Sequence, residues 1–192
     1  MIVLVILLCN PLCARGEEDE SVDYQFRFLL HGQQVVSNGI GVAGWGIVPN
    51  TLNTKTPIGV VLGGVVLKQE GRWMEIMAGT FINGRTPDDP LLDIRVSDTS
   101  NKIVHFFGEV RYSLKTDTLL ISPNIIFPIY TIWDKVVSIG AESDIFITKG
   151  KMKYGAGPRF VVPLPIKGWS LAIAYQIGNG QNILRSYLSY TF

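Results

Sequence analysis

Hydrophobic and polar residues alternate along this chain with a period of two. Between Tyr24 and the C-terminus, alternating runs of about 8 to 13 residues are separated by turn residues, which is the pattern of β-strands rather than helices. In the run 169–177, one face carries Trp, Leu, Ile, Tyr and Ile, whereas the other carries Ser, Ala, Ala and Gln. The pattern therefore predicts an all-β protein.

Eleven such runs can be counted. They are 24–31, 40–48, 58–67, 73–82, 92–97, 104–114, 119–129, 137–147, 152–164, 169–177 and 183–192. Two of them, 40–48 and 58–67, are rich in glycine, and the sequence leaves open which of their residues face inward. Bacterial single-chain barrels have an even number of strands. We therefore expect ten strands if 24–31 is not part of the wall, or twelve if one run is split, joined by short loops.

The two faces of these runs differ in a way that predicts where each one points. The apolar face carries large residues, and aromatic residues such as Tyr112, Trp133 and Trp169 lie near run ends, where they suit a membrane interface. Strands within lipid must close into a barrel, because every backbone polar group needs a partner. We therefore expect a closed antiparallel transmembrane β-barrel. A polar network should line its lumen, formed by Glu75, Arg95, His105, Glu109, Arg111, Glu142, Asp144, Arg159 and Arg185.

Composition narrows the function classes. The 192 residues correspond to one domain, and 47% hydrophobic against 17% charged residues excludes a disordered chain. Seventeen basic residues oppose sixteen acidic ones, and they form no basic stripe, so we expect no nucleic-acid partner.

The first residues predict export. The apolar stretch that starts at Met1 extends over roughly 14 residues, too short to span a membrane as a helix but long enough for a signal peptide. Small residues at Ala14 and Gly16 predict cleavage after Gly16. We therefore divide the chain into a signal peptide (1–16), an acidic flexible N-terminus (17–23) and a barrel (24–192).

The C-terminus carries a resemblance to a known family. The ending 187–192, Tyr-Leu-Ser-Tyr-Thr-Phe, resembles the terminal strand of small Gram-negative outer-membrane β-barrel proteins, with alternating apolar residues and a final Phe. The resemblance implies a location in the bacterial outer membrane, with the membrane lipids and the barrel assembly machinery as partners. It also implies that Tyr190 and Phe192 form the assembly signal. No subfamily can be assigned.

Catalytic and metal-binding patterns are weak. Barrel esterases that act on lipids use a His and a Ser two residues apart, but Gln33 follows His31 and Phe107 follows His105 at that spacing. Both cysteines fall in the predicted leader, and no paired histidines exist, so we expect no metal site and no cofactor. Trp73, just after a turn, is expected at the membrane interface.

Together these features favour an outer-membrane barrel without enzymatic activity, either a narrow porin-like channel for small solutes or a plugged structural barrel. Two alternatives remain. One is a lipid-modifying outer-membrane enzyme that uses His105 or His31. The other is a soluble periplasmic barrel that binds a lipophile. The sequence leaves the solute and the oligomeric state open.

Overall fold

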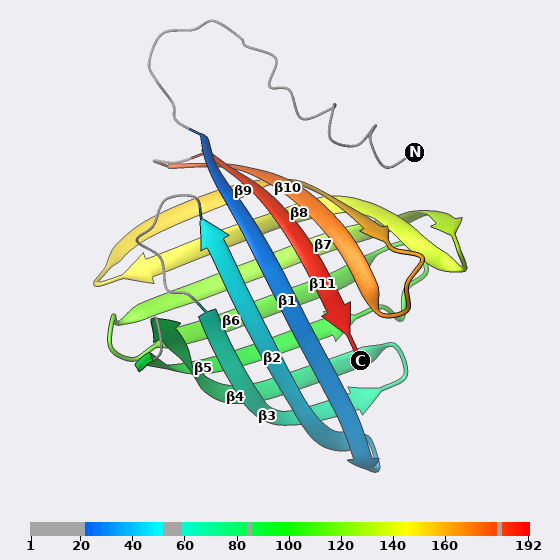
Figure 1. Cartoon of the computed structure of the whole chain (residues 1–192), viewed down its shortest axis with the longest axis horizontal. Coiled ribbons are helices and arrows are strands. Elements are labelled where there is room, and N and C mark those ends of the chain that lie inside the picture. Colours follow the sequence, from blue (N-terminus) through cyan, green and yellow to red (C-terminus); the bar gives the residue numbers. More distant parts are fainter. Residues whose placement is uncertain (1–21, 52–58, 84–85, 180–181) are drawn as a thin grey trace, which may run out of the picture.

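Eleven β-strands form a closed barrel in the computed structural model of the chain (Figure 1). The structure describes residues 22–51, 59–83, 86–179 and 182–192, so the predicted signal peptide and most of the acidic N-terminus lie outside it. The strands are β1 (Val22–Ser37), β2 (Ile40–Thr51), β3 (Gly59–Gln69), β4 (Arg72–Asn83), β5 (Thr86–Asp98), β6 (His105–Ser113), β7 (Thr118–Ile132), β8 (Lys135–Thr148), β9 (Lys151–Pro163), β10 (Trp169–Gly178) and β11 (Asn182–Thr191).

The barrel closes through a parallel pair. Consecutive strands are antiparallel neighbours, whereas β1 and β11 run in the same direction, in register from Val22 opposite Asn182 to His31 opposite Thr191 (Figure 1). The expectation of ten or twelve strands is therefore wrong. The first run belongs to the wall and extends to Ser37, and an odd number of strands can close only if one neighbouring pair is parallel. The all-β closed barrel itself is as predicted.

An odd strand number places the two ends of the barrel chain at opposite mouths. We call the end where β1 begins the N-mouth; it also contains the turns 114–117 and 149–150. The C-mouth is the end where β11 finishes, next to the turns 38–39, 70–71 and 133–134. A barrel with an even number of antiparallel strands would instead bring both ends to one mouth.

The two faces of the wall differ sharply in exposure. On β5, Leu92 and Ile94 are 54% and 45% exposed on the outside, whereas Asp93 and Arg95 between them are 1% and 2% exposed. This alternation follows from the pleat, which directs successive side chains to opposite sides of the sheet. The wall is thus apolar outside and charged inside over this strand.

Glycine allows the wall to coil tightly at specific positions. A Cβ atom at Gly64 would lie 2.1 Å from the carbonyl oxygen of Ile76, and one at Gly157 would lie 1.8 Å from that of Tyr175. Each position is therefore filled by the backbone of the neighbouring strand. Gly63 differs, because a Cβ added there would meet nothing within 4 Å.

One side of the interior is apolar and tightly packed. Val60, Leu62, Met77 and Leu91, from β3, β4 and β5, form a buried cluster in the half of the barrel near the N-mouth. Trp45, Ile47 and Phe81 pack against it. The glycine-rich runs that the sequence could not orient thus contribute inward residues such as Val60 and Trp45, with Val42 and Val61 outside.

Candidate functional site in the barrel lumen

A cavity of about 720 Å³ occupies the lumen. Its lining extends from Lys153 and Asn179 near the N-mouth to Thr99 and Thr191 near the C-mouth. Two clusters of hydrogen-bonded polar side chains contribute to its wall.

The first cluster is built around a fully buried carboxylate, Glu75 on β4. One oxygen accepts hydrogen bonds from His31 Nε2 and Gln33 Nε2, both at 2.7 Å. The indole N–H of Trp45 donates to the other oxygen at 2.6 Å. Donors from β1 and β2 therefore hold a carboxylate that lies two or three strands away. Two of these donors, Gln33 and Trp45, are neutral and do not compensate the negative charge of Glu75.

A ladder of ion pairs on β5 and β6 adjoins this group through the ring of Trp45. Arg95 lies 4.1 Å from the Trp45 ring and donates to Asp93 at 2.8 Å. Arg111 donates to the other oxygen of Asp93 at 2.9 Å and also to Glu109, which lies 3.5 Å from Arg95. The Glu75 cluster comprises His31, Gln33, Trp45, Glu75, Asp93, Arg95, Glu109 and Arg111.

Strand register explains this ladder. Glu75 lies opposite Arg95, and Arg95 lies opposite Glu109, across β4, β5 and β6. Asp93 lies opposite Arg111 in the same way. Directly opposed residues of antiparallel strands share a face and bring their Cβ atoms within about 5.5 Å, so Arg95 meets Glu109 and Arg111 meets Asp93 inside the barrel. Glu75 is instead held by the donors of β1 and β2.

The second cluster surrounds Glu142 on β8. The Tyr187 hydroxyl donates to it at 2.9 Å, and the amide of Gln176 donates at 3.0 Å. Two guanidinium groups join them, Arg159 at 3.0 Å and Arg185 at 3.4 Å. These donors come from β9, β10 and β11, so a single carboxylate ties four strands together.

Arg185 extends this cluster across the closing seam. It also pairs with Asp144 on β8, and its Nε donates to Gln25 Oε1 on β1 at 3.0 Å. Arg27 donates to the same Gln25 oxygen at 3.2 Å. The Glu142 cluster comprises Gln25, Arg27, Glu142, Asp144, Arg159, Gln176, Arg185 and Tyr187.

The structure places all nine of the residues predicted for the lumen on the inner side of the wall, though not in a single network. Four belong to the Glu75 cluster, namely Glu75, Arg95, Glu109 and Arg111, and four to the Glu142 cluster, namely Glu142, Asp144, Arg159 and Arg185. The ninth, His105, lines the cavity near the C-mouth and belongs to neither cluster. The partners of Glu109 are Arg95 and Arg111 rather than His105.

Several cluster members were not selected from the sequence. Asp93 could have been, because it alternates in phase with Arg95 on the charged face. Gln176 and Tyr187 lie on run faces with little charge, and Trp45 lies in a run without clear alternation. Their roles follow from contacts between distant strands, which no local pattern encodes.

Trp73 lies in the lumen and not at the membrane interface, so that expectation is wrong. Its ring is 5.7 Å from His31 and 5.9 Å from Phe107, and it lines the cavity. The physical reason is its phase, since Trp73 is two residues from Glu75 and therefore points to the same side of β4.

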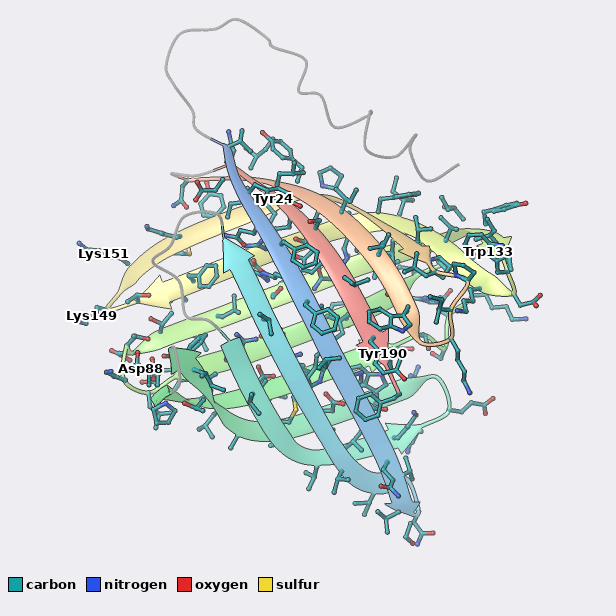
Figure 2. The ribbon with its side chains drawn as sticks, viewed as in Figure 1. Tyr24, Asp88, Trp133, Lys149, Lys151 and Tyr190 are labelled. Carbon is teal, nitrogen blue, oxygen red and sulfur yellow. The ribbon has the colours of Figure 1, made fainter. Side chains whose placement is uncertain are left out.

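Aromatic side chains on the outer surface gather near both mouths (Figure 2). Tyr24 on β1 lies near the N-mouth, and Trp133 and Tyr190 lie near the C-mouth. Each of these belts has further members. The N-mouth belt is Tyr24, Tyr112 and Tyr154, and the C-mouth belt is Tyr130, Trp133, Trp169 and Tyr190.

The two residues predicted as the assembly signal lie at the C-mouth end of the seam. Tyr190 packs between Trp169, at 5.0 Å between ring centroids, and Phe192, at 5.8 Å. The backbone N–H of Phe192 donates to the carbonyl of His31 at 3.1 Å. A Cβ atom on Gly32 would come within 2.4 Å of the Phe192 ring, so this glycine provides the space in which the ring lies across the seam.

The rim of the N-mouth is polar. Lys149 and Lys151 project from the β8–β9 hairpin, and Asp88 lies on the same end of the molecule (Figure 2). In the turn after β6, the amine of Lys115 donates to Asp88, and this hydrogen bond raises the pKa of Lys115 above its usual range.

Two elements of a catalytic site can be tested against the described residues. His31 and Glu75 form a His–carboxylate pair, in which a nucleophile would have to bond the second imidazole nitrogen. Among the described residues, the ring neighbours of His31 are Trp45 and Trp73, and no Ser, Thr or Cys side chain is hydrogen-bonded to it. Within the ranges that the structure describes, no group of three or more His, Cys, Asp and Glu side chains is arranged to hold a metal ion. In those same ranges, no helix is long and apolar enough to cross a membrane.

Comparison with known proteins yields no match to a family model, to a curated protein or to a solved structure.

Proposed function

We propose that this chain is an integral outer-membrane β-barrel whose lumen is a narrow channel for small solutes. One observation carries the proposal. The wall is apolar outside, its interior holds two clusters of charged side chains, and it encloses a cavity lined by residues from both mouths.

The outer surface supports a membrane location. Val110, Ile125 and Ile139 are among many large apolar side chains that project outward with 42–47% exposure. Leaving such surface in water costs free energy that lipid would remove, at about 25 cal/mol per Å². The strands contain 9 to 16 residues, and a tilted strand of about 9–11 residues crosses a bilayer. Aromatic belts near both mouths match the two interfaces of a membrane.

This arrangement disfavours a soluble barrel that binds a lipophile. Such a protein would turn its apolar face inward and its charges to the solvent. Here Glu75, Asp93 and Arg95 are buried inside, and their apolar neighbours are outside. Recovery of the protein in the soluble fraction without detergent would contradict the membrane proposal.

Conductance tests the channel. The chain should be refolded in detergent, checked for a change in gel mobility on boiling, and inserted into a planar bilayer. We expect small, reproducible current steps. Arg159→Gln should change the ion selectivity because it removes a cation from the cavity wall, whereas Lys102→Gln, an exposed loop residue, should not. A folded barrel that never conducts would contradict the proposed channel, but it would not contradict the proposed outer-membrane barrel.

A plugged structural barrel is the second candidate, favoured by the hydrogen bonds inside the lumen that join Glu142 on β8 to Gln176 on β10 and Tyr187 on β11. Glu142→Ala would distinguish the two. In a plugged barrel, this change should open a conductance that the unmodified protein lacks. In a channel, it should only alter a conductance that already exists.

Export is tested separately. If the leader is cleaved after Gly16, protein isolated from a Gram-negative outer-membrane fraction should begin at Glu17 when its N-terminus is sequenced. An intact Met1 on membrane-inserted protein would contradict the predicted signal peptide without affecting the barrel.

A further inference from the structure

One wall of the lumen carries an excess of positive charge. The Glu75 cluster contains three carboxylates, Glu75, Asp93 and Glu109, against two guanidinium groups and the imidazole of His31, which pairs with Glu75. The Glu142 cluster contains two carboxylates against three guanidinium groups, those of Arg27, Arg159 and Arg185. A solute in the cavity therefore faces one wall on which guanidinium groups outnumber carboxylates by one.

The excess positive charge can be assigned to particular atoms. The guanidinium of Arg185 has two carboxylate partners, because it donates hydrogen bonds to Asp144 and Glu142, and it also donates to Gln25. The hydrogen bond and the ring contact of Arg27 go to Gln25 and Tyr187, neither of which is a carboxylate. Arg159 shares Glu142 with Arg185, and its Nε is buried without a hydrogen-bond partner within the described chain.

Arg27 and Arg159 converge on one ring. Their guanidinium carbons lie 5.8 Å and 4.8 Å from the centroid of Tyr187, which lines the cavity. Asp144 interacts electrostatically with Arg27, and Glu142 pairs with Arg159, but Arg185 shares both carboxylates. Three guanidinium groups therefore share two carboxylates, and a further anion between Arg27 and Arg159 would reduce the repulsion between them. A guanidinium presents paired N–H donors that match the two oxygens of a carboxylate. Both arginines also line the cavity, so a solute can reach them.

Apolar surface adjoins this cationic position. Leu29 packs against the buried group that contains Tyr187, and it lines the cavity together with Ile126 and Phe107. A volume of about 720 Å³ falls within the usual range of small-molecule sites, about 300–1,000 Å³. The space is larger than an inorganic anion needs, and its lining suits a hydrocarbon body.

We infer that the lumen binds an organic carboxylate with an apolar body, whose carboxylate lies between Arg27 and Arg159 and whose body lies along Leu29. The inference rests on the proposed barrel and names the class of solute that its lumen takes. Binding requires only a folded barrel with an accessible lumen, so it can be measured independently of conductance.

Three probes separate the contribution of the carboxylate charge to binding from that of the apolar body. Calorimetry on the full chain refolded in zwitterionic detergent should show binding of 3-phenylpropanoate. The uncharged 3-phenylpropanamide, with the same body, and acetate, with the same charge, should each bind about tenfold more weakly or not measurably. Quenching of tryptophan fluorescence gives a second readout, because Trp45 and Trp73 line the cavity. Equal binding of the carboxylate and the amide would overturn the inference.

Arg27→Gln is the decisive variant, because among the described residues Arg27 forms no hydrogen bond or ion pair with a carboxylate, and Asp144, with which it interacts electrostatically, keeps its ion pair with Arg185. We expect it to weaken 3-phenylpropanoate binding about tenfold. Lys102→Gln removes the same charge from an exposed loop and should leave binding unchanged, which also corrects for partition of the probe into the micelle. Unchanged affinity in Arg27→Gln would overturn the inference.

The outcomes separate this inference from the proposed channel. A barrel that conducts but binds no probe would refute the carboxylate site and leave the channel. A barrel that binds the carboxylate but does not conduct would retain the site and refute the channel.

Discussion

The Glu75 and Glu142 clusters address the same problem with different chemistry. Each buries a carboxylate almost completely in the interior of the barrel. Glu75 is held by an imidazole, an amide and an indole, whereas Glu142 is held by two guanidinium groups, an amide and a phenol. Removing a charge from water is costly unless it is paired and hydrogen-bonded.

This difference determines which charged groups would lose a partner if each carboxylate were removed. The donors to Glu75 could lose their acceptor without leaving a guanidinium unpaired, since Arg95 and Arg111 pair with Asp93 and Glu109. Arg159 has no other carboxylate partner than Glu142 in the described chain. Glu142 should therefore contribute more to the free energy of unfolding than Glu75.

The largest expected effect tests this comparison directly. Glu142→Gln should lower the free energy of unfolding by about 3–5 kcal/mol, because it replaces a buried carboxylate that is the ion-pair partner of Arg159 and is shared with the buried Arg185. The matched change Glu75→Gln should cost about 1–3 kcal/mol, because only hydrogen bonds are impaired. Urea titrations of the refolded protein in the same detergent measure both. A larger loss for Glu75→Gln would break the comparison.

The wall that faces Glu142 gives the second prediction. Gly157 lies opposite Glu142 in the β8–β9 register, and the carbonyl of Tyr175 fills the place of a Cβ. Gly157→Ala should therefore cost about 1–3 kcal/mol through backbone displacement, and it should disturb the Glu142 cluster. Gly63→Ala, where space is open, is the control and should leave the unfolding midpoint unchanged or raise it. Equal losses of unfolding free energy for the two variants would show that the close backbone contact at Gly157 does not contribute to stability.

A smaller effect is expected from the indole that serves Glu75. Trp45→Phe keeps an aromatic ring beside His31 and Arg95 but removes one hydrogen bond, so it should cost about 1 kcal/mol. Trp133→Phe on the outer surface, with 52% exposure, is the control in the same urea titration. If Trp45→Phe matched Glu142→Gln in cost, neutral donors would be as important as charged ones.

The smallest effect is expected from an ion pair outside both clusters. Arg72 donates to Asp98 at 2.9 Å, and both side chains are largely exposed. Water screens such pairs, so Arg72→Gln should not change the unfolding midpoint measurably. A clear loss would mean that burial is not what distinguishes the two lumen clusters.

Sequence and structure agree on local features. The alternation of Leu92, Asp93, Ile94 and Arg95 is visible in the sequence, and the structure gives these residues opposite exposures. The expectation of an even number of strands was wrong, because it assumes that every neighbouring pair is antiparallel, whereas β1 and β11 are parallel. Whether β1 pairs with β11 depends on residues about 160 positions apart, as in the Arg185–Gln25 hydrogen bond, and no local pattern reports such a contact.

The sequence by itself determined that the chain forms strands, and for most strands which face is apolar, because the pleat converts a period of two directly into two sides. It also supplied the balanced charges of the lumen. Only the tertiary structure decided the number of strands, the parallel seam and the division of the charges into two clusters. These depend on closure, which brings distant strands together, and a side chain's partner across a closed wall is set by the register of every strand between them.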